Sequence, residues 1–412
     1  MTGSRATTSR TKRRLVAFAG ACLIFALGGV TSASATPASR AASAAAAAQW
    51  MADQQTDSGA FFSETLRVDL HAEALAAIVA GGIDESTLEA ALAYIAENGE
   101  AGATEGARTG RIIAAIVAGG EDPSDFNGVD YVAILASQFD TTTGTYRKDA
   151  TTLYTDLFSN LISANGDIAA DGELPTQAMD YILSQQCPDG GFAFGGVGDC
   201  AFNDVDTTAL AINAMANSGL DGSAIDAALD EARTYLLGAQ NDDGGFTFCC
   251  DGLTSSDSTG LALAAIAALG EDAEAHPWLQ ADEDDPVQAL ETLQTDEGSF
   301  RFAEEDFNGD PVTEGNSLST VNATPGMAGE SFPIQATEPD PDPDPTPTPT
   351  PSAPPDDDGN EETTTVDAVT VQPRITLPDT GTDPGESSML PALLVAIAGS
   401  ALIVGGVRKR GR

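Results

Sequence analysis

Cysteine has the widest chemistry of any residue type in this chain, and its positions are uneven. Cys22 lies in an apolar N-terminal segment, whereas Cys187, Cys200, Cys249 and Cys250 lie in two loop regions in the middle of the chain. Four cysteines in an exported protein indicate two disulfides, and a metal cluster is the alternative. Cys187–Cys200 with a vicinal Cys249–Cys250 bond is one pairing, and two bonds between the loops are the other. A vicinal disulfide strains the backbone, which favours the second pairing.

Carboxylates stand immediately before two alanine- and leucine-rich stretches. Asp204 and Asp206 precede Thr207–Asn217, and Asp257 precedes Ser258–Leu269. A short carboxylate at the start of a helix accepts hydrogen bonds from free backbone N–H groups. We therefore predict that Asp204 or Asp206 caps the first helix and that Ser255, Ser256 or Asp257 caps the second, with Asp206 and Asp257 favoured.

Two further sets of residues suggest ion binding. The run Asp306–Asp310 alternates oxygen ligands as calcium loops do, but it lacks the twelve-residue pattern with a terminal glutamate. We interpret it as a surface turn with at most weak calcium affinity. The second set consists of five basic residues: Arg67, Arg108, Arg111, Arg147 and Lys148. They would bind an anionic ligand or, as is more common, form ion pairs with carboxylates.

The elements that carry these residues repeat along the chain. The segment 181–192 aligns with 235–246, and each ends in glutamine, three further residues and Gly-Gly-Phe. Weaker copies occur at 54–61 and 294–300, and two degenerate units fit at 91–120 and 130–165. This spacing predicts six helix–turn–helix units with a period of roughly 40–55 residues. The turn residues that we expect to be structural are Gln186, Asp189, Gly190, Gly191 and Phe192, then Gln240, Asp243, Gly244, Gly245 and Phe246.

Each unit follows one physical logic. A first helix ends at the glutamine, and the Gly-Gly pair takes the positive φ angles that only glycine adopts cheaply. The phenylalanine then fills the gap between neighbouring hairpins, and alanine in the second helix allows close helix approach. No segment long enough to form a strand alternates between apolar and polar residues with a period of two. We therefore predict an all-α domain.

The Gln-x-x-Asp-Gly-Gly-Phe repeats resemble those of the α/α toroid superfamily, which includes squalene–hopene cyclases, prenyltransferase β subunits and cobalamin carriers. The resemblance spans about residues 49–336. It implies an α6/α6 barrel in which six hairpins close into a ring, with the second helix of each hairpin inside. The repeat is shared across families with different activities, so it specifies the fold better than the function.

The same resemblance suggests one catalytic role. Class II cyclases carry Asp-x-Asp-Asp-Thr-Ala, and here Asp204-Val205-Asp206-Thr207-Thr208-Ala209 stands in its place. This implies Asp206 as the general acid with Asp204 beside it, although Thr207 replaces the third aspartate. Such an acid needs burial and neighbouring carboxyls. Cyclase cavities also need aromatic walls, and aromatic residues make up only 6% of this chain.

Two other activities of the superfamily fit poorly. Prenyltransferases bind zinc through Asp, Cys and His, but Asp199-Cys200 departs from their pattern, and His71 and His276 stand elsewhere. A catalytic zinc needs three protein ligands. Thioester chemistry requires Cys-Gly-Glu-Gln, whereas Pro-Asp-Gly follows Cys187. We predict neither a metal site nor a cofactor.

The C-terminus resembles the cell-wall sorting signal of Gram-positive surface proteins. An apolar run at 389–407 and a basic tail follow the pentapeptide Leu377, Pro378, Asp379, Thr380 and Gly381. In that family a sortase cuts between the threonine and the glycine and joins the new end to peptidoglycan. The resemblance implies sortase and peptidoglycan as partners, with attachment through Thr380, and a membrane contact only before sorting.

The N-terminus agrees with export. Residues 1–35 combine basic residues, an apolar core and a small-x-small site that ends at Ala35, as a signal peptide does. The whole chain has a formal net charge of −45, and most of the acid lies outside the two ends. Such a charge excludes binding to nucleic-acid phosphates. Residues 337–376 are rich in Pro, Asp and Thr and predict an extended, disordered linker.

These observations predict four parts: a signal peptide (1–35), a toroid (36–336), a wall-spanning linker (337–376) and a sorting signal (377–412) with a transmembrane segment at 389–407. We expect a wall-anchored surface protein whose toroid binds a small or hydrophobic ligand or a partner outside the cell. The alternatives are a terpene cyclase-like enzyme that uses Asp206 as its acid, and a structural adhesin with a filled barrel.

Overall fold

The computed structural model describes residues 37–146, 156–247, 252–280, 283–306 and 308–336. The predicted signal peptide, linker and sorting signal, with the segment 389–407, lie outside the described residues. None of the helices in the described ranges is long and apolar enough to cross a membrane.

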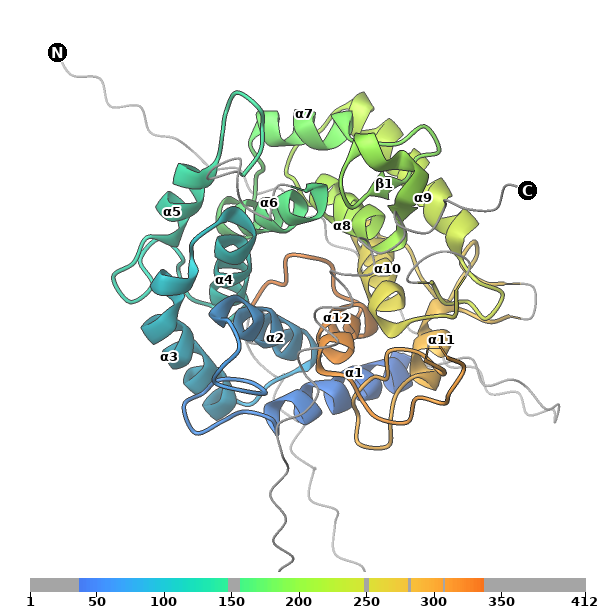
Figure 1. The fold of residues 1–412 in the computed structure, drawn as a ribbon, viewed down its shortest axis with the longest axis horizontal. Coiled ribbons are helices and arrows are strands. Elements are labelled where there is room, and N and C mark those ends of the chain that lie inside the picture. Colours follow the sequence, from blue (N-terminus) through green and yellow to red (C-terminus); the bar gives the residue numbers. More distant parts are fainter. Residues whose placement is uncertain (1–36, 147–155, 248–251, 281–282, 307, 337–412) are drawn as a thin grey trace, which may run out of the picture. The chain divides into compact units, whose positions relative to one another are not determined.

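The described residues form two concentric rings of helices (Figure 1). The inner ring consists of α2 (Val68–Gly81), α4 (Gly106–Ala118), α6 (Leu157–Asp171), α8 (Val205–Ala216), α10 (Ser256–Ala268) and α12 (Ser317–Ala328). The outer ring consists of α1 (Pro37–Ala52), α3 (Glu85–Gly102), α5 (Tyr131–Gln138), α7 (Thr176–Ser184), α9 (Ser223–Ala239) and α11 (Pro286–Thr292). Each inner helix packs on the next, and α12 packs on α2 to close the ring. The predicted toroid of six helical hairpins, with the second helix of each inside, is confirmed.

Side-chain polarity decides which helix of a hairpin lies inside. In α10 every residue from Ser256 to Ile266 is buried, and all but Asp257 are small or apolar. In α9 only Ile225, Ala228, Ala232 and Leu236 are buried, a spacing that places them on one face. The outer helices are thus amphipathic, whereas the inner helices are covered on both sides.

Small residues bring the inner helices together. A Cβ atom on Gly166 of α6 would lie 2.4 Å from the Cα atom of Gly110 in α4, closer than two carbons approach without covalent bonding. The α4 and α6 backbones therefore touch where these glycines meet. The ring is accordingly narrow, which limits the space inside it.

The two glycines of the repeat turn have different roles. Gly190 has a φ angle of +91° and Gly244 one of +84°, as predicted. Gly191 and Gly245 do not have positive φ angles, so that part of the prediction is wrong. They are small because their surroundings are tight: a Cβ atom on Gly191 would lie 2.7 Å from the Tyr235 ring.

The repeat glutamine joins neighbouring units. The Gln186 amide donates to the Gly190 carbonyl in its own turn (2.9 Å) and to the Ala228 carbonyl in α9 of the next unit (2.8 Å). Gln55, Gln240 and Gln294 make the equivalent pairs of bonds. Gln294 reaches Ser43 of α1 and so links the last unit to the first. The turn aspartates Asp189 and Asp243 each accept a bond from the backbone of the second glycine.

The aromatic residue after each turn is fixed by a polar side chain on the inner helix. The Phe192 backbone N–H donates to the Thr208 hydroxyl (2.9 Å), and Phe246 and Phe300 bind Thr259 and Thr320 in the same way. In the first unit His71 takes this place, and its Nδ1 accepts from Phe61 (3.0 Å). His71 is therefore a structural residue of the repeat.

The region between α7 and α8 is not purely helical. Two-residue strands, β1 (Phe192–Ala193) and β2 (Asn203–Asp204), pair antiparallel around the 3-10 helix η1 (Val197–Phe202), a small departure from the predicted all-α fold. A disulfide joins Cys187 to Cys200. This is the intraloop alternative, so the favoured pairing across two loops is wrong for these cysteines. Cys249 and Cys250 lie outside the described residues.

Substituting Gln55 tests the bridging role of the repeat glutamine. Gln55→Ala removes the bonds to Gly59 and to Thr87 in α3, and we expect it to lower the free energy of unfolding by about 1–3 kcal/mol. Gln54, the exposed neighbour, is the matched control, and Gln54→Ala is expected to change stability by less than about 0.5 kcal/mol. Urea denaturation of both variants measures the difference, and equal midpoints would contradict the bridging role.

Candidate functional site

The inner helices share a register, and it shows which residues face the centre of the ring. Counting from each N-cap, the sixth helical residue is Glu73 in α2, Arg111 in α4, Ile162 in α6, Leu210 in α8, Leu261 in α10 and Asn322 in α12. All six line one central cavity, which we call the lumen. The second helical residue lies one turn nearer the N-terminal mouth, where Phe158 and Asp206 also line the lumen.

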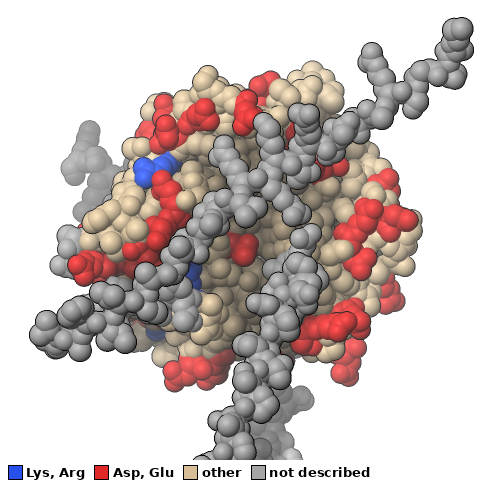
Figure 2. Space-filling model, turned by 180° about the vertical axis from the view of Figure 1, so that it is seen from behind, with Lys and Arg blue, Asp and Glu red and all other residues tan. Residues whose placement is uncertain are grey.

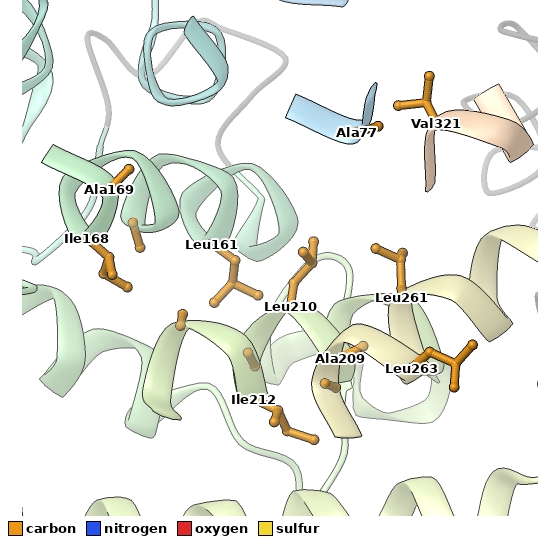
Figure 3. Packing of buried hydrophobic residues seen from close by; sticks show 14 of the residues in the cluster. Ala77, Leu161, Ile168, Ala169, Ala209, Leu210, Ile212, Leu261, Leu263 and Val321 are labelled. Carbon is orange, nitrogen blue, oxygen red and sulfur yellow. The ribbon is translucent and has the colours of Figure 1, made fainter. Parts of the chain in front are cut away.

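The lumen is small and has a mixed lining. It holds about 130 Å³ of free space. Leu210 and Leu261 point into it from adjacent helices, towards Ala77 and Val321, whereas Ile212 points the other way (Figure 3). The aromatic lining is thin, as the low aromatic content indicated, and among the described residues it consists of Phe158 and Phe332.

The segment after α12 covers the end of the lumen opposite Asp206. Phe332, Pro333 and Ile334 line the cavity. The Phe332 backbone N–H donates to Asn213 Oδ1 (2.8 Å), and Asn217 Nδ2 donates to the Phe332 carbonyl (2.7 Å). Both asparagines lie in or just after the last turn of α8, so this segment closes the C-terminal mouth.

Asp206 does not cap α8, and that prediction is wrong. The N-cap is Asp204, whose carboxylate accepts from the Thr207 backbone (2.7 Å) and from the Phe194 backbone (3.1 Å). Asp206 is instead the second helical residue, two positions after the N-cap. Its Oδ1 atom makes no hydrogen bond of standard geometry among the described residues, but the Ser258 hydroxyl of α10 interacts with this carboxyl and stabilises its charged form.

Burial dominates the electrostatics of the aspartates on α8. It raises the pKa of Asp206 well above its ordinary value, and the neighbouring Asp204 and Asp257 carboxylates raise it further. The pKa of Asp204 is also raised by burial, against the opposing effect of the bonds from Thr207 and Phe194. Asp206 is therefore held as a neutral acid over a wider pH range than a surface aspartate.

Asp257 occupies the equivalent position in α10. It is buried and accepts from Asn322 (3.0 Å) and Ser319 (3.3 Å) of α12, so it does not cap its helix; Ser255 does. Burial raises its pKa to about 6, although these two bonds stabilise the charged form. Asp206 and Asp257 thus place two perturbed carboxyls on neighbouring inner helices.

The arginines noted in the sequence pair with carboxylates. Arg111 contacts Asp69 (3.5 Å) and Glu73 (3.2 Å), Arg67 also contacts Asp69 (2.8 Å), and Arg108 contacts Glu105. Asp69 is fully buried. Ion pairing, the more common role, is therefore what the structure shows for these three. Arg147 and Lys148 lie outside the described residues.

Asn165 of α6 is a lumen residue that sequence reasoning missed. It is 8% exposed, it lines the lumen, and its Oδ1 atom has no hydrogen-bond partner in the described part of the chain. Counting helical positions from the cap at Asp156 would have found it, because it follows the lumen residue Ile162 by one turn.

The segment predicted to resemble a calcium loop is a turn in the described residues. Asp306 accepts from the Asn308 and Asp310 backbones (2.8 and 3.0 Å), an exposed turn as predicted, although residue 307 lies outside the described residues. The described ranges contain no group of three or more His, Cys, Asp or Glu placed to hold a metal. Acidic residues are scattered over the face shown in Figure 2, where basic residues are few.

Comparison with known proteins identifies the fold. No protein-family model and no curated protein matches this chain. Among solved structures it is similar to the type II terpene cyclase MstE from Scytonema, at 15% identity and a TM-score of 0.50, over 70% of this chain and 97% of that chain. Variants of MstE in complex with merosterolic acid A (product) and with geranylgeranyl dihydroxybenzoate (substrate) match at 15% and 14% identity, each with a TM-score of 0.50. Each covers 71% of this chain, and 97% and 98% of its own. At this identity the likeness shows a terpene cyclase-like helical toroid and no more.

Proposed function

We propose that the toroid is a binding module that holds a small, largely apolar ligand in its lumen and presents it outside the cell. The observation that carries this proposal is the lumen itself: it keeps about 130 Å³ free, and the Asn165 Oδ1 atom that lines it has no hydrogen-bond partner among the described residues. A filled barrel, as in the adhesin alternative, would leave neither free space nor unsatisfied polar atoms.

The volume sets the size of the ligand. Ligand pockets commonly measure roughly 300–1,000 Å³, whereas an apolar cavity of about 150 Å³ is known to accept benzene. At about 130 Å³, the lumen suits a compact molecule with a branched or cyclic apolar body.

Native mass spectrometry of the protein isolated from its own host tests this proposal. The wild type is expected to retain a small molecule, and Ala114→Leu, which fills the lumen from α4, is expected to lose it. Ala101→Leu on the exposed face of α3 is the matched control and should keep the ligand. A bare protein mass in all three samples would favour the adhesin.

Export and anchoring are part of the same proposal and depend on the two ends of the sequence. Thr380→Ala removes the residue whose carbonyl a sortase would attack. We expect the variant to move from the muramidase-released wall fraction to the membrane fraction. An unchanged wall fraction would contradict anchoring through Thr380.

A cyclase-like enzyme is the second candidate, because Asp206 is an acid that lines the lumen and burial raises its pKa. The related fold of MstE binds geranylgeranyl dihydroxybenzoate. Against this candidate stand the small volume, the thin aromatic lining and Thr207 in place of the third aspartate. If Asp206→Asn accumulates a linear isoprenoid that the wild type converts, the enzyme replaces the binding module.

A further inference from the structure

We propose that the N-terminal mouth of the toroid is a docking surface for a basic, amphipathic protein segment, one that combines aliphatic side chains with lysine or arginine. The residues of this surface are not among those that line the lumen, so the inference goes beyond the ligand-binding function proposed above and does not depend on it. It comes from the position of the exposed apolar side chains and from the charge around them.

The exposed large apolar side chains of the described residues gather at one end of the ring. Each lies in the loop before an inner helix or in the first turn of one, and together we call them the apolar patch: Phe194, Val197, Phe202, Leu253 and Leu318. The helices that follow, α8, α10 and α12, are neighbours in the inner ring (Figure 1). All inner helices are the second helix of a hairpin and run in one direction, so their N-termini share one mouth. Apolar side chains that gather in this way mark an interaction site, whereas scattered ones do not.

Equivalent positions on adjacent helices bring two members of the patch together. Phe202 stands two residues before the N-cap Asp204 of α8, and Leu253 stands two residues before the N-cap Ser255 of α10. Both N-caps have an extended backbone, and α8 packs on α10. The backbones of Phe202 and Leu253 are therefore separated by roughly the 8–10 Å that lies between packed helices.

The β1–β2 pair joins the two phenylalanines of the patch, and one of them reaches the lumen wall. Ala193 pairs with Asn203, and the next position in the same register sets Phe194 opposite Phe202. The Phe194 ring stacks on the ring of Phe158 in α6, with the ring centroids 5.4 Å apart. Because Phe158 lines the lumen, the patch continues the lumen wall at this mouth.

The loop before α8, which carries three members of the patch, is fixed in place. A disulfide between Cys187 and Cys200 closes it. The Phe194 backbone N–H donates to the Asp204 carboxylate (3.1 Å), and the Phe194 carbonyl accepts from the Leu157 backbone (3.0 Å). A patch that is already ordered loses little conformational entropy when a partner binds.

The charge around the patch selects the partner. Arg301 is the only basic residue in the three loops before α8, α10 and α12 (185–204, 240–255 and 293–316), and its guanidinium group already donates to the Val312 carbonyl (3.0 Å). The same loops carry exposed carboxylates: Asp199, Glu304, Glu305, Asp306, Asp310 and Glu314. These carboxylates attract lysine and arginine. They repel anionic lipids and a second copy of this chain, whose formal net charge is −45.

Three synthetic peptides test the inference by fluorescence anisotropy on the full-length protein. They are an amphipathic helix of leucine and lysine, the same helix with glutamate in place of lysine, and the same sequence with serine in place of leucine. We expect the leucine–lysine peptide to bind at least tenfold more tightly than the serine–lysine peptide, which measures charge attraction alone. The leucine–glutamate peptide should bind most weakly. Equal binding of the two lysine peptides, or no binding of either, overturns the inference.

Two exposed substitutions locate the contact. Phe202→Ser is expected to weaken the leucine–lysine peptide at least fivefold and to leave the serine–lysine peptide unchanged. Glu304→Gln is expected to weaken both lysine peptides, more at low than at high ionic strength. Glu89→Gln, an exposed change of the same kind on α3, is the matched control and should change neither. Unchanged binding of the leucine–lysine peptide to Phe202→Ser overturns the inference.

Other occupants of the patch give different results. Binding to phosphatidylglycerol vesicles that Phe202→Ser abolishes would assign the patch to a membrane. A dimer in sedimentation velocity that the same variant abolishes would assign it to a second copy of the chain. Either result overturns the protein-segment proposal. Native mass spectrometry tests the lumen separately, so failure of the docking surface leaves the ligand-binding function standing.

Discussion

Asp206→Asn is expected to make the protein more stable at neutral pH and to flatten its dependence of stability on pH. The folded protein raises the pKa of Asp206 well above its unfolded value near 3.8. Between those two values the folded state keeps a proton that the unfolded state has lost, so the free energy of unfolding falls as pH rises. An asparagine has no proton to lose and removes this contribution.

Urea denaturation from pH 3 to pH 8 measures the effect. The two proteins should differ least below pH 4, where aspartate is neutral in both states. As the pH rises from 4 to 8, the difference in free energy of unfolding between the wild type and Asp206→Asn should change by more than about 1.4 kcal/mol, the equivalent of one pKa unit. Asp221→Asn, an exposed change of the same kind, is the control. Parallel curves for wild type and Asp206→Asn would show that the carboxyl is solvated.

Phe192→Ala is expected to lower the free energy of unfolding by about 3–5 kcal/mol. The Phe192 side chain is fully buried between neighbouring hairpins, and its backbone is fixed by Thr208. Truncation would leave a cavity that the surrounding helices cannot fill, because the ring is closed and its members already touch at small residues.

Phe202→Ala is the matched control for Phe192→Ala, since Phe202 lies in the same loop region but is 67% exposed. It is expected to change the free energy of unfolding by less than about 0.5 kcal/mol. Thermal and urea denaturation measure the free energy of unfolding of both variants. The comparison separates the loss of a buried phenyl ring from the loss of an exposed one. Similar losses in the two would contradict the role of Phe192 as the residue that fills the space between units.

Two features of the described residues limit the free space in the lumen. The MstE structures share the toroid with this chain at low identity. Here Phe332 to Ile334 cover one mouth, and Gly110 and Gly166 bring two inner helices into contact. Both features reduce the free space in which a long prenyl chain would have to fold.

Local sequence determined the repeating parts of this protein. The glutamine, the first turn glycine and the buried phenylalanine make contacts within one hairpin or with the next. Their roles can therefore be predicted from the sequence of each repeat by itself. The resulting six hairpins are what the structure shows. The signal peptide and the sorting signal stay predictions from the sequence, because both ends lie outside the described residues.

Only the tertiary structure decided what lies in the lumen. Asp206 caps nothing, because Asp204 occurs two residues earlier and takes the cap; the sequence leaves both assignments open. Asn165 and Asp206 are 41 positions apart and line one lumen because the ring sets α6 beside α8. Cys187 pairs with Cys200 because the chain turns back between β1 and β2. Such contacts depend on how the helices close into a ring, whereas the repeat motif encodes only the hairpins from which the ring is built.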